Sequence, residues 1–441
     1  MALTTRIRNG AKPVVRWGLR HAVPRTAVRA AARRGDLQAR LIGLAAAPGS
    51  PDLTELFDEI RARGPLVRGD FAHITTRHAA VREVLTSNDF RTGVGAGGSG
   101  LLSRLDAWSA PGHLHPVTPP SLLATEPPEH TRYRKLVTRV FTVKAVENLR
   151  ERAEEIAAEL LDALDARAQE GPVDLAEAYC GLLPVTVIAE ILGVPPEDRR
   201  RVLELGTAAA PSLDMGLSWR QFRAVDAALV AFDAWLSDHL ARLRANPGDN
   251  LLSRLAAATE DGVGLTDLEL RATAGLVLAA GFETTVNLLG NGIALLRGNP
   301  AELETLRREP RLWPNAVDEV LRVDPPVLLT GRTCLRDTEV LGTRVRAGAV
   351  VTTVLAGANR DPEVFADPAR FDVRRENARE HVSFSAGRHY CLGAALARME
   401  GEVGLRALFD RFPDLRLTPG ASRRGTRVLR GYEHLPALLR G

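Results

Sequence analysis

Apolar residues recur at three- and four-residue spacing over most of the chain from about residue 50 onward, which is the period of an amphipathic helix. This pattern predicts helices over 145–169, 187–206, 221–245, 266–298, 301–308, 314–322 and 392–411. Text typical of strands is confined to 65–76 and 338–356, and turns are indicated at Val340-Leu341-Gly342-Thr343 and Ala347-Gly348. The sequence therefore predicts a mainly α fold with small β-sheets.

The longest predicted helix starts at a capping box, Thr266-x-x-Glu269, and stops near Gly298-Asn299-Pro300. At 1.5 Å per residue it would extend over roughly 50 Å. A helix of that length is long enough to cross the whole molecule.

Two segments, 91–124 and 207–219, carry no such period and contain many Gly and Pro residues or small residues. Loops of this length are usually lids, binding loops or disordered segments, and the sequence does not decide among these. The stretch 93–98 also matches G-x-G-x-x-G, but polar residues 87–92 precede it, and the Pro-rich text about 20 residues on has no acid until Glu126. A dinucleotide site needs a buried strand before the glycines, so we interpret 93–98 as a loop.

The composition is that of an ordinary soluble globular protein, with 441 residues of which 45% are hydrophobic and 25% charged. Three scattered cysteines, Cys180, Cys334 and Cys391, are too few for a disulfide scaffold, and a reducing cytoplasm is expected. No apolar run approaches the roughly 20 residues of a membrane span, and no secretory signal is evident.

The net charge of +4 hides an asymmetry, because residues 1–40 contain ten Lys and Arg but one acid, Asp36. The rest of the chain is mildly acidic and lacks a basic stripe, which disfavours nucleic acid as a partner. We therefore expect a basic N-terminal arm (1–45) and one domain (46–441). Pro13 and Pro24 divide the arm, whose position and charge favour a partly disordered tail. An interfacial segment on an anionic membrane and an organelle transit peptide are the alternatives.

The stretch 384–393, Phe-Ser-Ala-Gly-Arg-His-Tyr-Cys-Leu-Gly, carries the chemistry. Gly387 and Gly393 let the backbone approach something flat and bulky. Helical text follows Cys391 directly, so the sulfur lies at a helix N-terminus, where the dipole favours a thiolate. A thiolate beside a bulky planar group is what a haem iron needs as an axial ligand.

With Phe384, Gly387, His389, Cys391 and Gly393 in place, the sequence resembles the cytochrome P450 superfamily over about residues 50–441, in particular soluble enzymes of actinobacteria and a mycobacterial branch. Ser385 departs from the family pattern, where Gly is usual; we expect this to be tolerated in a turn. The resemblance implies a helical haem domain with a β-rich lobe, heme b as cofactor and Cys391 as the iron ligand.

Two further stretches resemble the family. Glu319-x-x-Arg322, followed by Arg370, would form its structural Glu–Arg–Arg network. Ala280-Gly281-Phe282-Glu283-Thr284-Thr285 resembles its oxygen-activating segment. There the resemblance assigns Thr284 to a hydrogen bond with dioxygen and Glu283 to a proton relay, with Ala280 against the cofactor. Gly281 would leave room for a ligand against the helix.

Haem also carries two propionates, which need basic partners when buried. Matching family positions are occupied by His130, Arg134, Arg332 and His389; the first two are four residues apart and so share a helix face. Cys180 and Cys334 match no ligand position and are expected to be ordinary buried thiols.

The expected function is therefore a haem-thiolate monooxygenase that inserts one oxygen atom of dioxygen into an apolar small molecule in the bacterial cytoplasm. No reductase sequence follows the domain, so electrons would come from a ferredoxin and its reductase, which could dock near Arg388, Arg398 and Arg322. Weak contact with a membrane surface is expected through residues 1–40. A haem-thiolate binding or sensor protein without turnover is the alternative. A cysteine hydrolase using Cys391 and His389 is disfavoured, because residues two apart on a turn rarely form a nucleophile–base pair.

Overall fold

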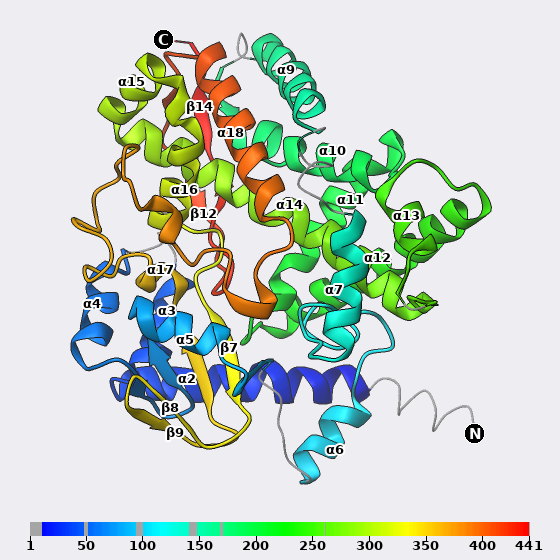
Figure 1. The fold of residues 1–441 in the computed structure, drawn as a ribbon, viewed down its shortest axis with the longest axis vertical. Helices are drawn as coiled ribbons and strands as arrows, with labels where there is room; N and C mark the ends of the chain where they lie inside the picture. Colours follow the sequence, from blue (N-terminus) through cyan, green and yellow to red (C-terminus); the bar gives the residue numbers. More distant parts are fainter. Residues whose placement is uncertain are drawn as a thin grey trace.

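One long helix, α14 (Asp267–Gly298), runs through the middle of the protein, and most other elements are arranged around it (Figure 1). The computed structural model describes residues 11–47, 52–93, 100–140, 147, 149–167, 171–260 and 262–440. The predicted capping box is confirmed: the Thr266 hydroxyl accepts from the Glu269 N–H, and the Glu269 side chain accepts from the Thr266 N–H. By length and composition α14 could span a membrane, but most of it is buried as in a core helix.

Helices dominate the described residues, as the sequence predicts. Beside α14 the α-helices are α2 (Val23–Arg33), α3 (Leu37–Ala45), α4 (Thr54–Ala62), α5 (His78–Thr86), α6 (Leu101–Trp108), α7 (Glu129–Val140), α9 (Arg150–Arg167), α10 (Leu182–Ile191), α11 (Pro196–Ala209), α12 (Trp219–Ala245), α13 (Leu251–Ala257), α15 (Pro300–Arg308), α16 (Trp313–Val323), α17 (Leu355–Ala358) and α18 (Ala394–Arg411). Shorter helical turns are η1 (Gly18–Ala22), η3 (Ala176–Cys180), η4 (Ala210–Leu213), η5 (Pro310–Leu312), η6 (Ala378–Glu380) and η7 (Gly387–His389).

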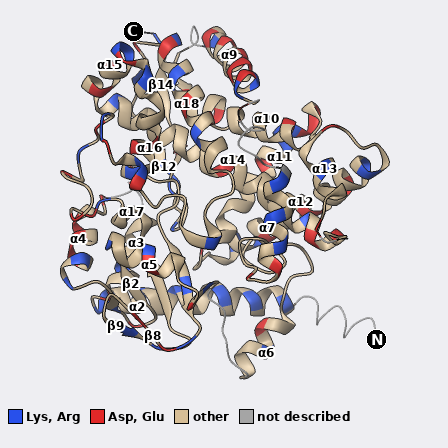
Figure 2. Cartoon of the chain, viewed as in Figure 1, with Lys and Arg blue, Asp and Glu red and all other residues tan. Residues whose placement is uncertain are grey.

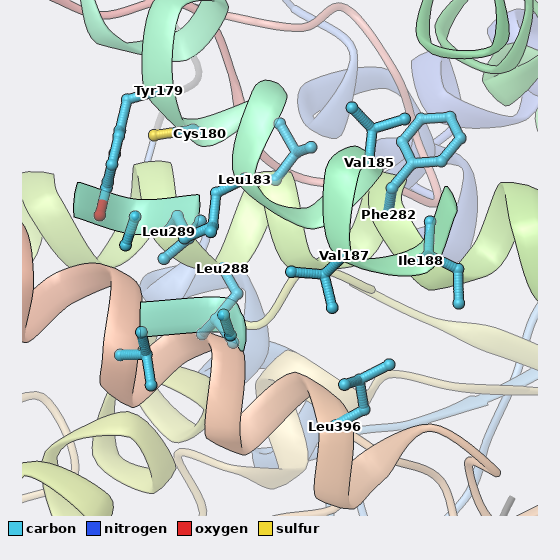
Figure 3. Packing of buried hydrophobic residues seen from close by; sticks show 14 of the residues in the cluster. Tyr179, Cys180, Leu183, Val185, Val187, Ile188, Phe282, Leu288, Leu289 and Leu396 are labelled. Atoms are coloured by element: carbon cyan, nitrogen blue, oxygen red, sulfur yellow. The ribbon is translucent and has the colours of Figure 1, made fainter. Parts of the chain in front are cut away.

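The main hydrophobic core lies where α10, α16 and α18 pack around α14. Leu183 and Ile188 of α10 point toward Leu289 and Phe282 of α14 (Figure 3). Apolar residues on all sides of a helix fit burial within a protein, and α10 has this character over nearly its whole length. Cys180 and Cys334 are buried, as expected from the sequence.

The strands form one five-stranded sheet and several small ones. The large sheet has the order β1 (Val67–Arg68), β2 (His73–Thr75), β10 (Val350–Thr353), β7 (Thr330–Cys334) and β3 (Phe90–Thr92), with only the β2–β10 pair parallel. The second sheet joins β11 (Arg416–Leu417), β14 (Pro436–Leu438) and β4 (Val173–Asp174). Three two-stranded pairs remain: β5 (Thr259–Glu260) with β6 (Val263–Gly264), β8 (Thr338–Val340) with β9 (Thr343–Val345), and β12 (Ser422–Arg423) with β13 (Tyr432–His434).

The turns predicted around Gly342 and Gly348 are confirmed. Leu341 and Gly342 have φ values of +44° and +78°, and Gly348 has a φ of +80°. The helix predicted over 187–206 is wrong, because it is divided into α10 and α11. Gly193 there has a φ of +68°, and Pro195 and Pro196 prevent the first helix from continuing.

The two aperiodic segments contain more structure than their sequences indicate. Segment 91–124 includes the end of β3 and α6, while 94–98 of its glycine motif lies outside the described residues. In segment 207–219, α11 continues to Ala209 and is followed by η4. Neither segment is aperiodic throughout.

The basic arm differs most from the expectation of a partly disordered tail. Residues 11–33 form one continuous helix, of which Gly18–Ala22 is a π-helical turn. Pro24 comes just after this turn, and a proline ring would clash with the carbonyl four residues back in a regular helix. The wider turn accommodates the ring, and the Val23 N–H donates to the Gly18 carbonyl.

This N-terminal helix (residues 11–33) connects α6 with the segment 214–219 and with α12. Arg16 pairs with Asp226 of α12 at 2.5 Å, and Arg20 forms two hydrogen bonds with Asp106 of α6 at 2.7 and 2.9 Å. The Trp17 indole N–H donates to the Leu217 carbonyl at 3.0 Å. The helix therefore joins the two segments, 91–124 and 207–219, that the sequence leaves open as lids, binding loops or disordered loops.

Arg16→Gln should loosen this junction, because it leaves the half-buried Asp226 with only His113 as a partner. We expect a loss of about 1.5–3 kcal/mol of local stability, measured as faster hydrogen exchange in residues 101–109 and 213–218. Arg34→Gln is the control, because it breaks an exposed ion pair with Asp70 that contributes under about 1 kcal/mol. Equal exchange in the two variants would show that the contacts do not hold the junction together.

Candidate active site

The loop before α18 presents Cys391 through a reversal of the backbone. The Cys391 N–H donates to the Phe384 carbonyl at 2.9 Å, and the Tyr390 N–H donates to the Gly387 carbonyl at 3.1 Å. Gly387 has a φ of +67°, and a Cβ there would lie 2.6 Å from the Leu85 carbonyl oxygen. Only glycine fits this position, because both the backbone angle and the close approach exclude a side chain.

Ser385, where the sequence departs from the family pattern, occupies a second strained position in this loop. Its φ is +63°, a left-handed conformation that is about 1–2 kcal/mol less favourable for a residue with a side chain than for glycine. Ser385 is therefore accommodated in the turn, as expected, but with strain that glycine would avoid.

Cys391 as a residue is exposed to solvent, but many protein atoms lie around its sulfur and partly desolvate the thiol. Burial raises the pKa of its thiol, opposed by the Gly393 N–H and by the charges of Arg134 and Arg398. The N–H at the helix N-terminus lowers the pKa of the thiol, as expected, and so do the two arginines. Desolvation has the larger effect, so the pKa is raised overall. A bound metal cation would reverse this balance, because a coordinating thiol is deprotonated.

Phe384, the first residue of the cysteine loop, packs against Arg398 of α18. The Arg398 guanidinium lies 4.6 Å from the centre of the Phe384 ring, and its Nε donates to Asp318 at 2.7 Å. Asp318 is fully buried, and this carboxylate fixes the cation beneath the aromatic ring.

Three of the four residues predicted to bind propionates gather on one side of the loop, around Glu126. The His389 Nε2 lies 3.3 Å from Glu126 Oε1, and the His130 and His389 rings are 4.4 Å apart. Arg332 is buried on β7 opposite Thr92 of β3, whose N–H and hydroxyl both donate to Glu126. The sheet register thus brings Arg332 to the same place as the two histidines.

Arg134, the fourth predicted residue, is on α7 one turn after His130. Its Nη2 donates to the Tyr390 carbonyl at 2.8 Å, and Cys391 and Arg134 influence each other's pKa through their charges. Arg134 therefore contacts the cysteine loop itself and lies beside the thiol.

The buried Arg332 has no carboxylate within ion-pair distance among the described residues, and the one acid of the cluster, Glu126, already pairs with Arg388. Burial lowers the pKa of Arg332 to about 10 and that of His389 to about 4. The His130 Nε2 is buried and has no hydrogen-bond partner among the residues that the structure describes. An unpartnered donor, a desolvated guanidinium and a nearby thiol are the groups that haem propionates and a haem iron need, so the residues present fit this cofactor.

Near the middle of α14, one face of an otherwise buried helix is open. Ala280 is exposed and Thr284 is half-buried, whereas Phe282, Glu283 and Thr285 are buried. The Thr284 hydroxyl donates to the Ala280 carbonyl at 2.9 Å. The prediction that Gly281 leaves room for a ligand is wrong, because a Cβ there would lie 3.1 Å from Ile188 of α10; its small size permits helix packing.

Glu283 lies on the buried side of α14, where it pairs with Arg424. Burial raises the pKa of Glu283, and the Arg424 charge opposes that rise. The pKa of Glu283 therefore lies above the usual value of a carboxyl group.

The buried ionic network below the loop contains Glu319 and Arg322, as predicted, but not Arg370. Both side chains of the first pair are fully buried and share two hydrogen bonds, at 2.7 and 2.8 Å. The Arg370 side chain is 64% exposed, and only its carbonyl takes part. Arg375 is the third member, with its Nε 3.1 Å from Glu319 Oε1; it follows Arg374 directly, and the sequence does not tell the two arginines apart.

The predicted ferredoxin patch is also corrected. Arg322 is fully buried and cannot dock a partner, while Arg388 and Arg398 are held by Glu126 and Asp318. Glu126 and Arg424 are also members of the site, and neither was expected there from the sequence. Glu126 could have been suspected as an acid beside Pro127-Pro128 just before His130, whereas nothing near Arg424 marks it.

Comparisons with known proteins agree with this geometry. The cytochrome P450 family model matches residues 212–422. A relative from Mycobacterium bovis that carries the designation cytochrome P450 140 is 52% identical over 434 residues, covering 97% of this chain and 98% of that relative. The 6-deoxyerythronolide B hydroxylase of Saccharopolyspora erythraea is 42% identical, with 72% and 77% of the two chains covered. Among solved structures, the cytochrome P450 PksS of Bacillus subtilis superposes with a TM-score of 0.78 at 32% identity, covering 88% and 97%.

Arg375→Gln should destabilise the protein, because it removes one guanidinium from a buried carboxylate. We expect a loss of about 3–5 kcal/mol, visible as a lower unfolding temperature. Arg370→Gln removes an exposed guanidinium and should change stability by less than about 0.5 kcal/mol. If the exposed variant melts at the lower temperature, the assignment of Arg375 to the network is wrong.

Proposed function

The chain belongs to the cytochrome P450 family of monooxygenases, and we propose that Cys391 is the thiolate ligand of its haem iron. The observation that supports this role most directly is the cysteine loop, where two left-handed residues and the Cys391–Phe384 hydrogen bond hold Cys391, a residue that the chain leaves partly open to solvent. In the described residues no group of three or more His, Cys, Asp and Glu side chains could hold a metal. A single cysteine ligand is consistent with a cofactor that brings its own nitrogen ligands.

We propose that the haem is heme b and that His130, Arg332 and His389 hold its propionates. The buried Arg332 and the unpartnered His130 Nε2 would each gain an anionic partner. Arg134 would stabilise the thiolate side of the site through its contact with the loop. Phe384, Gly387 and Gly393 would shape the loop against the ring, and Ala280 would face the ring from α14.

When bound, the haem supplies the activation of dioxygen. The chain's own residues orient an apolar substrate, exclude water and deliver protons. We propose that the Thr284 hydroxyl, which now donates to the Ala280 carbonyl, would be free to donate to dioxygen when the haem is bound. Glu283, whose pKa burial raises, would return a proton toward the Thr284 hydroxyl.

We further propose a ferredoxin and a ferredoxin reductase as the electron donors, and the cytoplasm as the location. The surface near the cysteine loop offers Tyr390, which is 40% exposed, and Arg379, whose side chain is 71% exposed although its Nε also pairs with Asp318 at 3.1 Å. The catalytic domain would comprise residues 46–441, and residues 1–45 would contact a membrane surface weakly.

Reconstitution with a ferredoxin, its reductase and NADPH should give hydroxylated product from an apolar substrate that wild-type protein binds. Cys391→Ala should abolish product, because no other side chain replaces the thiolate. Cys180→Ala is the control, since this cysteine is buried in the core. Product from Cys391→Ala would refute the ligand assignment, and haem without product in the wild type would favour a binding or sensor protein.

Thr284→Ala should separate electron use from product formation. We expect NADPH consumption to continue while product per NADPH falls about a hundredfold, since positioned proton transfer contributes at least that much. Thr273→Ala is the matched control, because that hydroxyl lies on the same helix, buried and without a partner. Unchanged coupling in Thr284→Ala would remove this residue from the proton relay.

A further inference from the structure

The basic residues of the N-terminal helix (residues 11–33) form one continuous row. Lys12, Arg16 and Arg20 are four residues apart, and so are Arg25, Arg29 and Arg33. The one step of five residues, from Arg20 to Arg25, spans the π-helical turn Gly18–Ala22. A π turn holds more residues than an α turn, so the row continues across it. The helix contains no Asp or Glu, and Figure 2 shows the basic residues along it.

The two halves of this row have different surroundings. Arg16 and Arg20 pair with carboxylates of the protein body, and Lys12 lies over the Trp108 ring. Arg25, Arg29 and Arg33 have no carboxylate within ion-pair distance in the part of the chain that the structure describes. Burial lowers the pKa of the neighbouring Arg427, and Arg25 and Arg29 lower it further. The second half thus accumulates unbalanced positive charge.

Exposed apolar side chains lie on the elements that flank this row. On α6, Leu101 is 72% and Leu102 66% exposed, and Trp108 is 36% exposed. On the other flank, Met215 is 41% exposed beside Gly216, which approaches Arg25. Val23 of the helix itself is 62% exposed. These residues are held next to the helix by the Arg20–Asp106 and Trp17–Leu217 contacts.

We propose that the N-terminal helix, α6 and the turn at 214–217 together form a surface that docks on an anionic lipid bilayer. Unpaired arginines attract acidic headgroups, and leucine, methionine and tryptophan side chains insert at the boundary between headgroups and acyl chains. An acidic protein would satisfy the arginines but would not account for two adjacent leucines left in water.

The docking surface is connected with the candidate active site through two segments of the chain. This part of the inference rests on the proposed function. The segment that contains α6 begins at β3, beside Glu126 and Arg332, and returns to Glu126. The segment 214–218 follows α11, which packs on Phe282 of α14. The two segments therefore connect the docking surface with elements that surround the candidate active site.

The test is flotation of the full-length holoenzyme with vesicles of phosphatidylcholine alone or mixed with phosphatidylglycerol. The wild type should bind only the anionic vesicles. Arg25→Gln/Arg29→Gln/Arg33→Gln should weaken binding about a hundredfold, since each arginine near an anionic surface contributes about fivefold. The control Arg200→Gln/Arg244→Gln/Arg254→Gln removes the same charge from the exposed surfaces of α11, α12 and α13 and should bind as the wild type does.

The contribution of the exposed apolar side chains is tested with Leu101→Ser/Leu102→Ser. This variant should bind the anionic vesicles about tenfold more weakly at both low and high salt. Val263→Ser/Leu335→Ser is its control, because these residues are similarly exposed elsewhere. Three results would each overturn the proposal: an equal loss of vesicle binding in the two arginine variants, equal binding of the wild type to both kinds of vesicle, or unchanged binding of the leucine variant. The last result would favour an acidic protein partner. The carbon monoxide spectrum of the same samples separates the two levels: a normal haem spectrum without flotation refutes the docking alone, and flotation without a thiolate spectrum refutes the proposed function alone.

Discussion

A buried carboxylate shared by two guanidinium groups fixes the part of the chain on which the candidate site depends. Glu319 lies between Arg322 and Arg375, and the two arginines also donate to the carbonyls of residues 359, 366, 368 and 370. Desolvating three charges is unfavourable unless every donor finds a partner, and here the backbone supplies the missing acceptors. Asn359 in turn accepts from the Val382 N–H, so the network extends to the start of the cysteine loop.

The loop and the basic cluster then depend on where distant segments return. The left-handed residues Ser385 and Gly387 orient Cys391, while the pairing of β3 with β7 brings Arg332 opposite Thr92 and thus near Glu126. The N-terminal helix extends this arrangement outward, because its contacts with α6 and Leu217 hold the two segments that lead away from the site. Cofactor site and outer surface are therefore parts of one connected structure.

The sequence predicts the mainly α fold, the long capped helix and the cysteine loop, because their signals are local: period, caps and closely spaced glycines. Its errors concern choices made by packing. Arg375 rather than Arg370 completes the network. Both arginines follow Asp367-Pro368 closely in the sequence. Only the path of the backbone decides which of the two side chains turns inward. Gly281 serves contact with Ile188 rather than a ligand. The basic arm is helical because Asp106 and Asp226, remote in sequence, receive its arginines.

The proposed chemistry depends on a haem iron ligated by the Cys391 thiolate, and one spectrum tests this ligation most directly. The purified protein would be reduced with dithionite under carbon monoxide and its Soret absorption recorded. We predict a strongly red-shifted band, as a thiolate ligand donates electron density to the iron. A haem protein whose band is not shifted would contradict the claim, because the sulfur would then be protonated or not the ligand.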